Sequence, residues 1–176
     1  MNVHVIYESM YGNTHAIADA IAEGARSTGA DVTVAPVSAA PSGAEAVDLL
    51  VVGGPTHMHG LASELSRKMA AKSAEEDGHA LDPAGTEGPG LRDWLRRLDH
   101  AQGASAAAFD TRGDAKSALT GSAARGIARR LHRHGYAVTD RASFLVDDAE
   151  GPLADGELDR AKAWGAQLAQ QSAAVS

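Results

Sequence analysis

The chain has no cysteine and few aromatic residues, and both scarcities limit its chemistry. Without cysteine there can be no disulfide, no thiolate metal site and no cysteine nucleophile. Of its 176 residues 44% are hydrophobic but only 4% are aromatic, so the core must consist mainly of Ala, Val and Leu. Few rings therefore remain for stacking on a ligand.

The chain also lacks an excess of basic residues. It has 16 Lys and Arg against 23 Asp and Glu, a net charge of −7, which argues against nucleic acid or an anionic membrane as a partner. No stretch is long and apolar enough for membrane insertion, and no basic region followed by an apolar one opens the chain. We expect one cytoplasmic domain over residues 1–176.

Hydrophobic periodicity predicts strands alternating with helices. Strands are expected at 3–7, 31–37, 47–54, 104–109 and 136–146, the last either continuous or as a broken pair. Helices are expected to begin near residue 13, at Leu61 and at Leu91, and another is marked by Leu119, Ala123, Ile127 and Leu131. A final helix capped by Asp155 should bury Leu158, Ala161, Gly165 and Leu168. Residues 78–90 and 110–119 are predicted loops, and the former could cover a site.

This order predicts an α/β fold, a three-layer doubly wound sandwich. Right-handed crossovers favour a five-stranded parallel sheet in the order 2-1-3-4-5. In such a sheet ligands bind beyond the carboxyl ends of the first, third and fourth strands, so the three following loops are candidate site segments.

The first of these loops is the turn from Ser9 to Thr14, between an apolar strand and an amphipathic helix. The first amides of a helix lack carbonyl partners and its dipole favours an anion, so the turn suits a phosphate. No lysine follows Gly12 and no G-x-G-x-x-G is present, which disfavours triphosphate chemistry. The alternative is a tight turn capped by Asn13 or Thr14.

The string Ser9-x-x-Gly12-Asn13-Thr14 after a first strand resembles the phosphate loop of flavodoxins, which holds the phosphate of FMN. Residues 7–14 are similar to flavodoxin-domain proteins outside the short electron-carrier type. Residues 151–153 with Gly156 and Glu157 resemble the ending of actinobacterial-type flavodoxin-domain proteins. The resemblance implies FMN as cofactor, with its phosphate in the turn Ser9, Met10, Tyr11, Gly12, Asn13 and Thr14. Tyr11 departs from the pattern because it replaces a hydroxyl residue of the usual loop.

The resemblance implies further cofactor contacts in the loops after the third and fourth strands. Pro55, Thr56, His57 and Met58 would line the isoalloxazine ring, and Gly60 would let the peptide reorient. The alternatives for His57 and His59 are metal ligation, although no carboxylate is near in sequence, and exposure to solvent.

In the third loop, Thr111, Arg112 and Gly113 would close the far side of the ring. A cation at Arg112, near the N1 and O2 edge, would stabilise negative charge on the reduced ring. The alternative is an ordinary ion pair with Asp110 or Asp114.

These expectations lead to an FMN-binding redox protein, either a carrier or a small oxidoreductase, serving a redox partner protein or a small-molecule electron acceptor. The acidic balance favours a basic partner, and residues 78–90 could also contribute to a homodimer or admit a quinone, as in an FMN-dependent quinone reductase. No acid, base or nucleophile dedicated to catalysis is visible, and no G-x-S-x-G motif is present. Because the aromatic pair that sandwiches the ring in flavodoxins is missing, the remaining alternative is a binding or regulatory module that has lost flavin.

Overall fold

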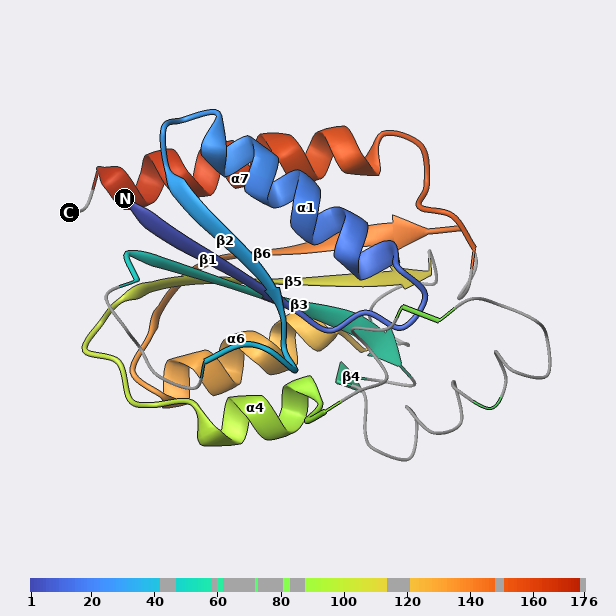
Figure 1. Ribbon diagram of the computed structural model, residues 1–176, viewed down its shortest axis with the longest axis horizontal. Coiled ribbons are helices and arrows are strands. Elements are labelled where there is room, and N and C mark those ends of the chain that lie inside the picture. Colours follow the sequence, from blue (N-terminus) through green and yellow to red (C-terminus); the bar gives the residue numbers. More distant parts are fainter. Residues whose placement is uncertain are drawn as a thin grey trace.

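A twisted sheet between two helical layers forms the frame of the molecule in the computed structural model (Figure 1). The structure describes residues 1–41, 47–57, 60–61, 72, 81–82, 88–113, 121–147 and 151–174.

Five strands run parallel in the order β2-β1-β3-β5-β6, which confirms the predicted 2-1-3-4-5 arrangement. They are β1 (Asn2–Tyr7), β2 (Asp31–Pro36), β3 (Leu49–His57), β5 (Ser105–Gly113) and β6 (Ala137–Val146). A short strand, β4 (Gly60–Leu61), pairs antiparallel with the end of β3. The last strand is continuous, with a register shift opposite Ala106 and Ala107.

The helices cover the two faces of the sheet in pairs (Figure 1). Helices α1 (Asn13–Arg26) and α7 (Glu157–Ala173) lie on one face, and α4 (Leu91–Arg97) and α6 (Ala123–Arg133) lie on the other. Among the helices that the structure describes, none is long and apolar enough to cross a membrane.

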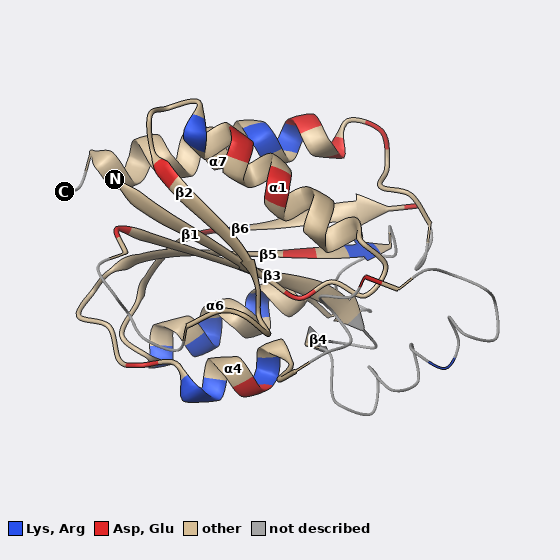
Figure 2. Ribbon diagram, in the orientation of Figure 1, with Lys and Arg blue, Asp and Glu red and all other residues tan. Residues whose placement is uncertain are grey.

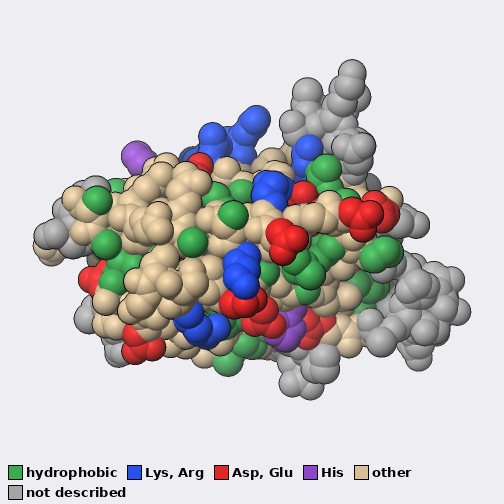
Figure 3. Space-filling model, turned by 90° about the horizontal axis from the view of Figure 1, so that it is seen from above, with side chains coloured by type: hydrophobic (Ala, Val, Ile, Leu, Met, Phe, Trp, Pro, Cys, Tyr) green, Lys and Arg blue, Asp and Glu red, His purple; other side chains and the backbone are tan. Residues whose placement is uncertain are grey.

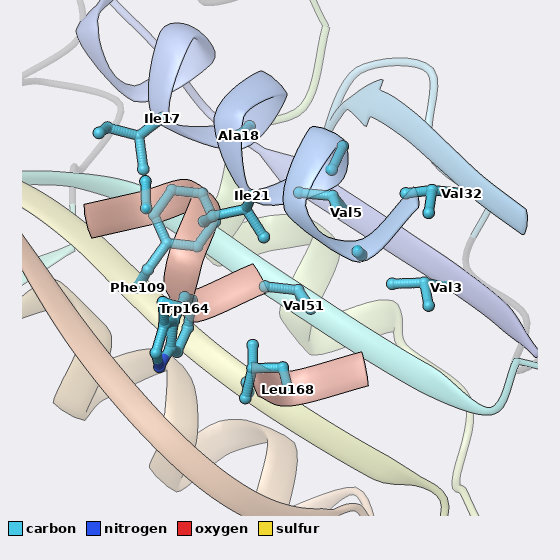
Figure 4. Close-up of a cluster of buried hydrophobic side chains, with 14 of the residues drawn as sticks. Val3, Val5, Ile17, Ala18, Ile21, Val32, Val51, Phe109, Trp164 and Leu168 are labelled. Atoms are coloured by element: carbon cyan, nitrogen blue, oxygen red, sulfur yellow. The ribbon is translucent and has the colours of Figure 1, made fainter. Parts of the chain in front are cut away.

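Each face of the sheet has its own hydrophobic core. Under α1 and α7, the Phe109, Phe144 and Trp164 rings form successive edge-to-face pairs and contact the aliphatic side chains of α1 (Figure 4). Under α4 and α6, small strand residues such as Ala106 and Ala108 leave room for helix side chains including Trp94 and Leu131. The low aromatic content therefore suffices because the rings are concentrated where layers meet.

Several local expectations were wrong. Leu61 belongs to β4 rather than to a helix, and the rest of that expected helix lies outside the described residues, apart from a helical Lys72. Leu158 is 47% exposed, and Trp164 occupies the buried face of α7 with the three other predicted residues. Asp155 does not cap α7: Gly156, with φ of 80°, stands at that position and no side chain caps the helix.

A backbone-to-backbone approach joins α1 and α7. A Cβ atom at Gly165 would lie 2.0 Å from the Ile21 carbonyl oxygen, and one at Gly24 would lie 1.9 Å from the Lys162 carbonyl oxygen. Real Cβ atoms do not approach backbone oxygens so closely, so the two helices can lie at this distance only because both positions are glycine.

We predict that Gly165→Ala lowers the free energy of unfolding by about 1–3 kcal/mol, because the helices must move apart and repack. Urea denaturation measures the change. Gly126→Ala in α6 is the matched control: its Cβ would meet ordinary contacts of 3.5 Å or more, so the better helix propensity of alanine should leave stability unchanged or higher. Equal effects of the two substitutions would contradict the close-contact explanation.

Candidate functional site

The carboxyl ends of β1, β3 and β5 meet around a cavity of about 130 Å³. The described residues that line it come from the three predicted loops and from the end of β6: Met10, Tyr11, Asn13, Thr14, Pro55, Thr56, Thr111, Arg112, Gly113 and Val146. The neighbouring strands β1, β3 and β5 thus bring together residues about a hundred positions apart in sequence.

A left-handed glycine and one hydrogen bond to a serine side chain shape the β1–α1 turn. Gly12 stands before the first residue of α1 with φ of 89°, a left-handed conformation that glycine adopts without strain. The buried Ser9 hydroxyl accepts a hydrogen bond of 3.1 Å from the Gly12 amide. A 14-residue helix begins directly after the turn, and the first amides of this helix have no carbonyl partner within the helix.

Two threonines connect this turn to β5. The Oγ1 atoms of Thr14 and Thr111 are 2.7 Å apart, and both residues are buried. One hydroxyl donates to the other, so the accepting hydroxyl keeps its proton for a further acceptor. The Asn13 side chain instead donates to the Gly151 carbonyl oxygen at 2.7 Å, which ties the segment before α7 to the turn.

A short piece of the predicted 78–90 loop contacts the same turn. The Asp82 amide donates to the Met10 carbonyl oxygen at 2.8 Å, and the Asp82 carboxylate lies 3.1 Å from Nδ1 of His15. The His15 ring stacks on Tyr7 with centroids 4.5 Å apart. Burial, together with the charges of Asp82 and Asp19, raises the pKa of Tyr7 to about 12, so its phenol stays protonated at neutral pH.

Asp110 fixes the far side of the cavity. Its Oδ2 accepts hydrogen bonds from the hydroxyls of Thr56 and Ser122, at 2.9 and 2.7 Å, and from the Ala124 amide at 2.9 Å. The Thr56 hydroxyl in turn accepts from the Ala123 amide at 2.9 Å. The end of β3, the end of β5 and the start of α6 are thereby locked together by one fully buried carboxylate.

Arg112 is the one cation among the described residues that line the cavity. Its Nε and Nη1 atoms are buried and have no hydrogen-bond partner among the described residues. The predicted alternative, an ion pair with Asp110, is wrong, because Asp110 bonds Thr56, Ser122 and α6 instead. Asp114, the other suggested partner, lies outside the described residues. Buried donors without a partner are costly, so this guanidinium is the strongest indication of an anionic or carbonyl-bearing ligand.

Aromatic residues contribute little to the cavity. All seven aromatic residues are described, and six of them are buried away from it: Tyr7, Trp94, Phe109, Tyr136, Phe144 and Trp164. Only Tyr11 lines the described part of the cavity. The position that departs from the expected phosphate loop is therefore also the one ring available there.

The structure brings most of the predicted site residues together. Ser9 and Gly12 shape the turn from behind the cavity lining, Met58 and His59 lie outside the described residues, and nothing is described of the His57 side chain. Asp110 to Gly113 continue strand β5 instead of forming a loop, so this site segment is more rigid than expected. Val146 and the Asp110 network were not predicted: Val146 is the last residue of β6, and the only signal for Asp110 was an acidic residue directly after the predicted strand 104–109.

We predict that Asp110→Asn lowers the free energy of unfolding by about 1–3 kcal/mol, because three donors lose a charged acceptor and a buried amide group gains no partner. Urea denaturation gives the value. Asp93→Asn, at an exposed residue paired only with Arg96 across one turn of α4, is the control and should cost less than about 1 kcal/mol. A cost at Asp110 no larger than at Asp93 would show that the network does not hold the site.

Residues 4–75 match a family model described as a flavodoxin domain. Three solved structures have similar folds, each with a TM-score of 0.63. A flavodoxin from the domain Archaea is 21% identical, with 98% of this chain and 99% of that chain covered. Oxidised flavodoxin 1 from Bacillus cereus is 19% identical, with 97% and 98% covered. In rubredoxin oxygen:oxidoreductase from Desulfovibrio gigas, 18% identical, 98% of this chain covers 36% of that chain.

No curated protein matches the chain. The match over residues 4–75 and the order of the sheet agree, and the chain has a flavodoxin-like fold.

Proposed function

We propose that the chain binds FMN at the carboxyl ends of β1, β3 and β5 and carries electrons through the flavin, as a carrier or a small oxidoreductase. The observation that carries the proposal is the cavity at which the β1–α1 turn, Pro55 and Thr56, and the end of β5 meet. The flavodoxin-domain match over residues 4–75 and the flavodoxins among the similar structures support the same ligand.

The donors at the cavity suit the two polar ends of FMN. The start of α1 offers amides and a helix dipole to the phosphate, and one hydroxyl of the Thr14 and Thr111 pair keeps a proton to donate. Arg112 also lines the cavity, and a carbonyl or anionic ring edge of the ligand would satisfy its unpartnered nitrogens. The residues present therefore fit the cofactor.

When bound, the flavin supplies the electron-accepting chemistry, and the protein supplies position and electrostatics. The Thr56 hydroxyl is already engaged in both directions by Asp110 and the Ala123 amide, so Thr56 acts as a fixed wall of the cavity and not as a donor to the ring. Asp110 is a positioning residue, since it holds this wall against α6. Arg112 places positive charge where negative charge would grow on reduction.

The scarcity of rings at the cavity favours one second candidate, a flavin-free binding module with the same fold. Stacking of an aromatic side chain on a ligand ring contributes up to about 1.5 kcal/mol of binding free energy per pair, beyond the contribution of the buried area. With Tyr11 alone available among the described lining residues, affinity for FMN depends mainly on its phosphate. Direct titration separates the two candidates.

We predict that the fluorescence of FMN is quenched when the purified protein is added. FMN should bind at least tenfold more tightly than riboflavin, which lacks the phosphate. Thr14→Val should weaken FMN binding about tenfold, the loss of one hydrogen bond to a charged group, and leave riboflavin binding nearly unchanged. Flavin fluorescence measures both affinities.

Thr33→Val, at an exposed position of β2 far from the cavity, is the control and should change neither affinity. Equal affinities for FMN and riboflavin would remove the phosphate from the proposal. Absence of any flavin binding would favour the flavin-free module.

We predict that Arg112→Ala lowers the midpoint potential of the bound flavin by roughly 50–100 mV. A charge several ångströms from the ring, at an effective dielectric constant of about 20, interacts with it by about 2 kcal/mol, and a tenfold change corresponds to about 59 mV for one electron. Arg97→Ala, at an exposed residue of α4 that lines no cavity among the described residues, is the control. A spectroelectrochemical titration that gives the same midpoint for the wild type and Arg112→Ala would contradict this role.

A further inference from the structure

The basic residues of this acidic protein are concentrated on one helical face (Figure 2). Helix α4 carries three arginines and α6 carries four, out of 16 basic residues in the whole chain. We call the five that interact most directly the basic face: Arg92, Arg96, Arg129, Arg130 and Arg133.

Electrostatic repulsion shows that these arginines lie close enough to act together. The pKa of Arg130 is lowered from its ordinary value first by burial and then by the charges of Arg92, Arg133, Arg129 and Arg96. The basic face thus combines positive charge from two helices that are neighbours on the same side of the sheet. Like charges in one patch are unfavourable in the free protein and are relieved when a negative surface approaches.

The basic face is largely uncompensated. Arg96 pairs with Asp93 in α4, at 2.8 Å, and Arg92 and Arg130 donate to the carbonyl oxygens of Leu61 and Gly126. Across the described ranges of the chain, no acidic side chain pairs with the exposed Arg129 or Arg133. The last turn of α6 therefore presents positive charge to solvent.

The opposite face is arranged differently. On α1 and α7 acidic and basic side chains alternate and pair, as in the ion pairs between Glu23 and Lys162 and between Glu157 and Arg160. Figure 3, which looks onto this face, shows red and blue side chains intermixed over it. The charge segregation is therefore specific to α4 and α6.

The basic face also leads to the candidate site. Arg92 of α4 donates to the Leu61 carbonyl oxygen in β4, and β4 pairs with Thr56 and His57 of β3. The first amides of α6 bond Thr56 and Asp110. A partner that covers the whole length of both helices would extend from the last turn of α6 to the β4 end of the site, and weak redox encounters are steered by complementary charge.

The size of the patch and the overall charge favour a compact acidic partner. Helix α6 has 11 residues, about 16 Å at 1.5 Å per residue. A long polyanion or an anionic membrane would extend beyond this patch and meet a protein of net charge −7. A small protein with a local acidic patch can match the face without meeting the remaining acidic surface.

We propose that the basic face of α4 and α6 is the docking surface for a small acidic electron-transfer protein. This inference rests on the proposed function for the meaning of the encounter, but the association itself does not require flavin. It differs from what the net charge predicts, since the net charge favours a basic partner.

The test measures association with a plant-type [2Fe–2S] ferredoxin, used as a small acidic electron carrier, by isothermal titration calorimetry at low ionic strength. Arg129→Gln/Arg133→Gln removes two charges from the basic face, and Arg26→Gln/Lys162→Gln removes two from α1 and α7. Both variants change the net charge equally. We expect the first to weaken association at least fivefold, the second to change it less than twofold, and 0.3 M salt to abolish the difference.

FMN affinity, measured on the same samples by fluorescence, separates the two proposals. Face-dependent association without FMN binding would overturn the redox function and leave the docking surface. FMN binding with equal effects of the two double variants, or with no association of the wild type, would overturn the docking surface alone. Tighter, face-dependent binding of phosphatidylserine vesicles or of a 20-base-pair DNA duplex than of ferredoxin would overturn the acidic-protein assignment.

Discussion

The site depends on one buried carboxylate. Asp110 stands inside β5, is fully buried, and collects three donors from the end of β3 and the start of α6 on a single oxygen. Hydrogen bonds replace the hydration of Oδ2, whereas the buried Oδ1 has no partner among the described residues. The three donors on Oδ2 join these segments. Thr56 consequently cannot move independently of α6, and the wall of the cavity is rigid before any ligand arrives. The same network orients the helix that carries much of the basic face.

Scarcity of aromatic residues shapes both the interior and the site. Phe109, Phe144 and Trp164 form one chain of edge-to-face contacts beneath α1 and α7, and the close approach of those helices at Gly24 and Gly165 completes that layer. With rings committed to layer contacts, the cavity is lined by hydroxyls, backbone and Arg112. A flavin held there would depend on its phosphate and ring edge more than on stacking, which links affinity directly to the helix start and to the guanidinium.

Charge is distributed by face and not evenly over the surface. The acidic total of the chain hides a basic face whose arginines repel one another, and one of them, Arg92, bonds β4 beside the end of β3. Net charge describes attraction at long range, whereas a docked partner meets only the charges on the face that it covers. Net charge favours a basic partner, whereas the charges on the α4 and α6 face favour an acidic one. The charges on the covered face are the more relevant once the molecules are in contact.

The sequence determined what depends on neighbours along the chain. Apolar runs predicted the parallel strands, and the turn at Ser9 to Thr14 carried the phosphate-site motif, because periodicity and turn chemistry are local. The order of the sheet followed from the alternation of strands and helices and the handedness of crossovers. Local patterns gave wrong predictions where tertiary contacts decide the structure. Leu61 lies in a strand paired with β3, and Gly156 instead of Asp155 stands before the first residue of α7. Asp110 to Gly113 continue β5 into the site. Only the tertiary structure decided that Thr14 meets Thr111, that Asp110 holds Thr56 and α6 together, and that the arginines of two separate helices form one face. These contacts join residues far apart in sequence, and their geometry is set by the packing of layers, which no local pattern contains.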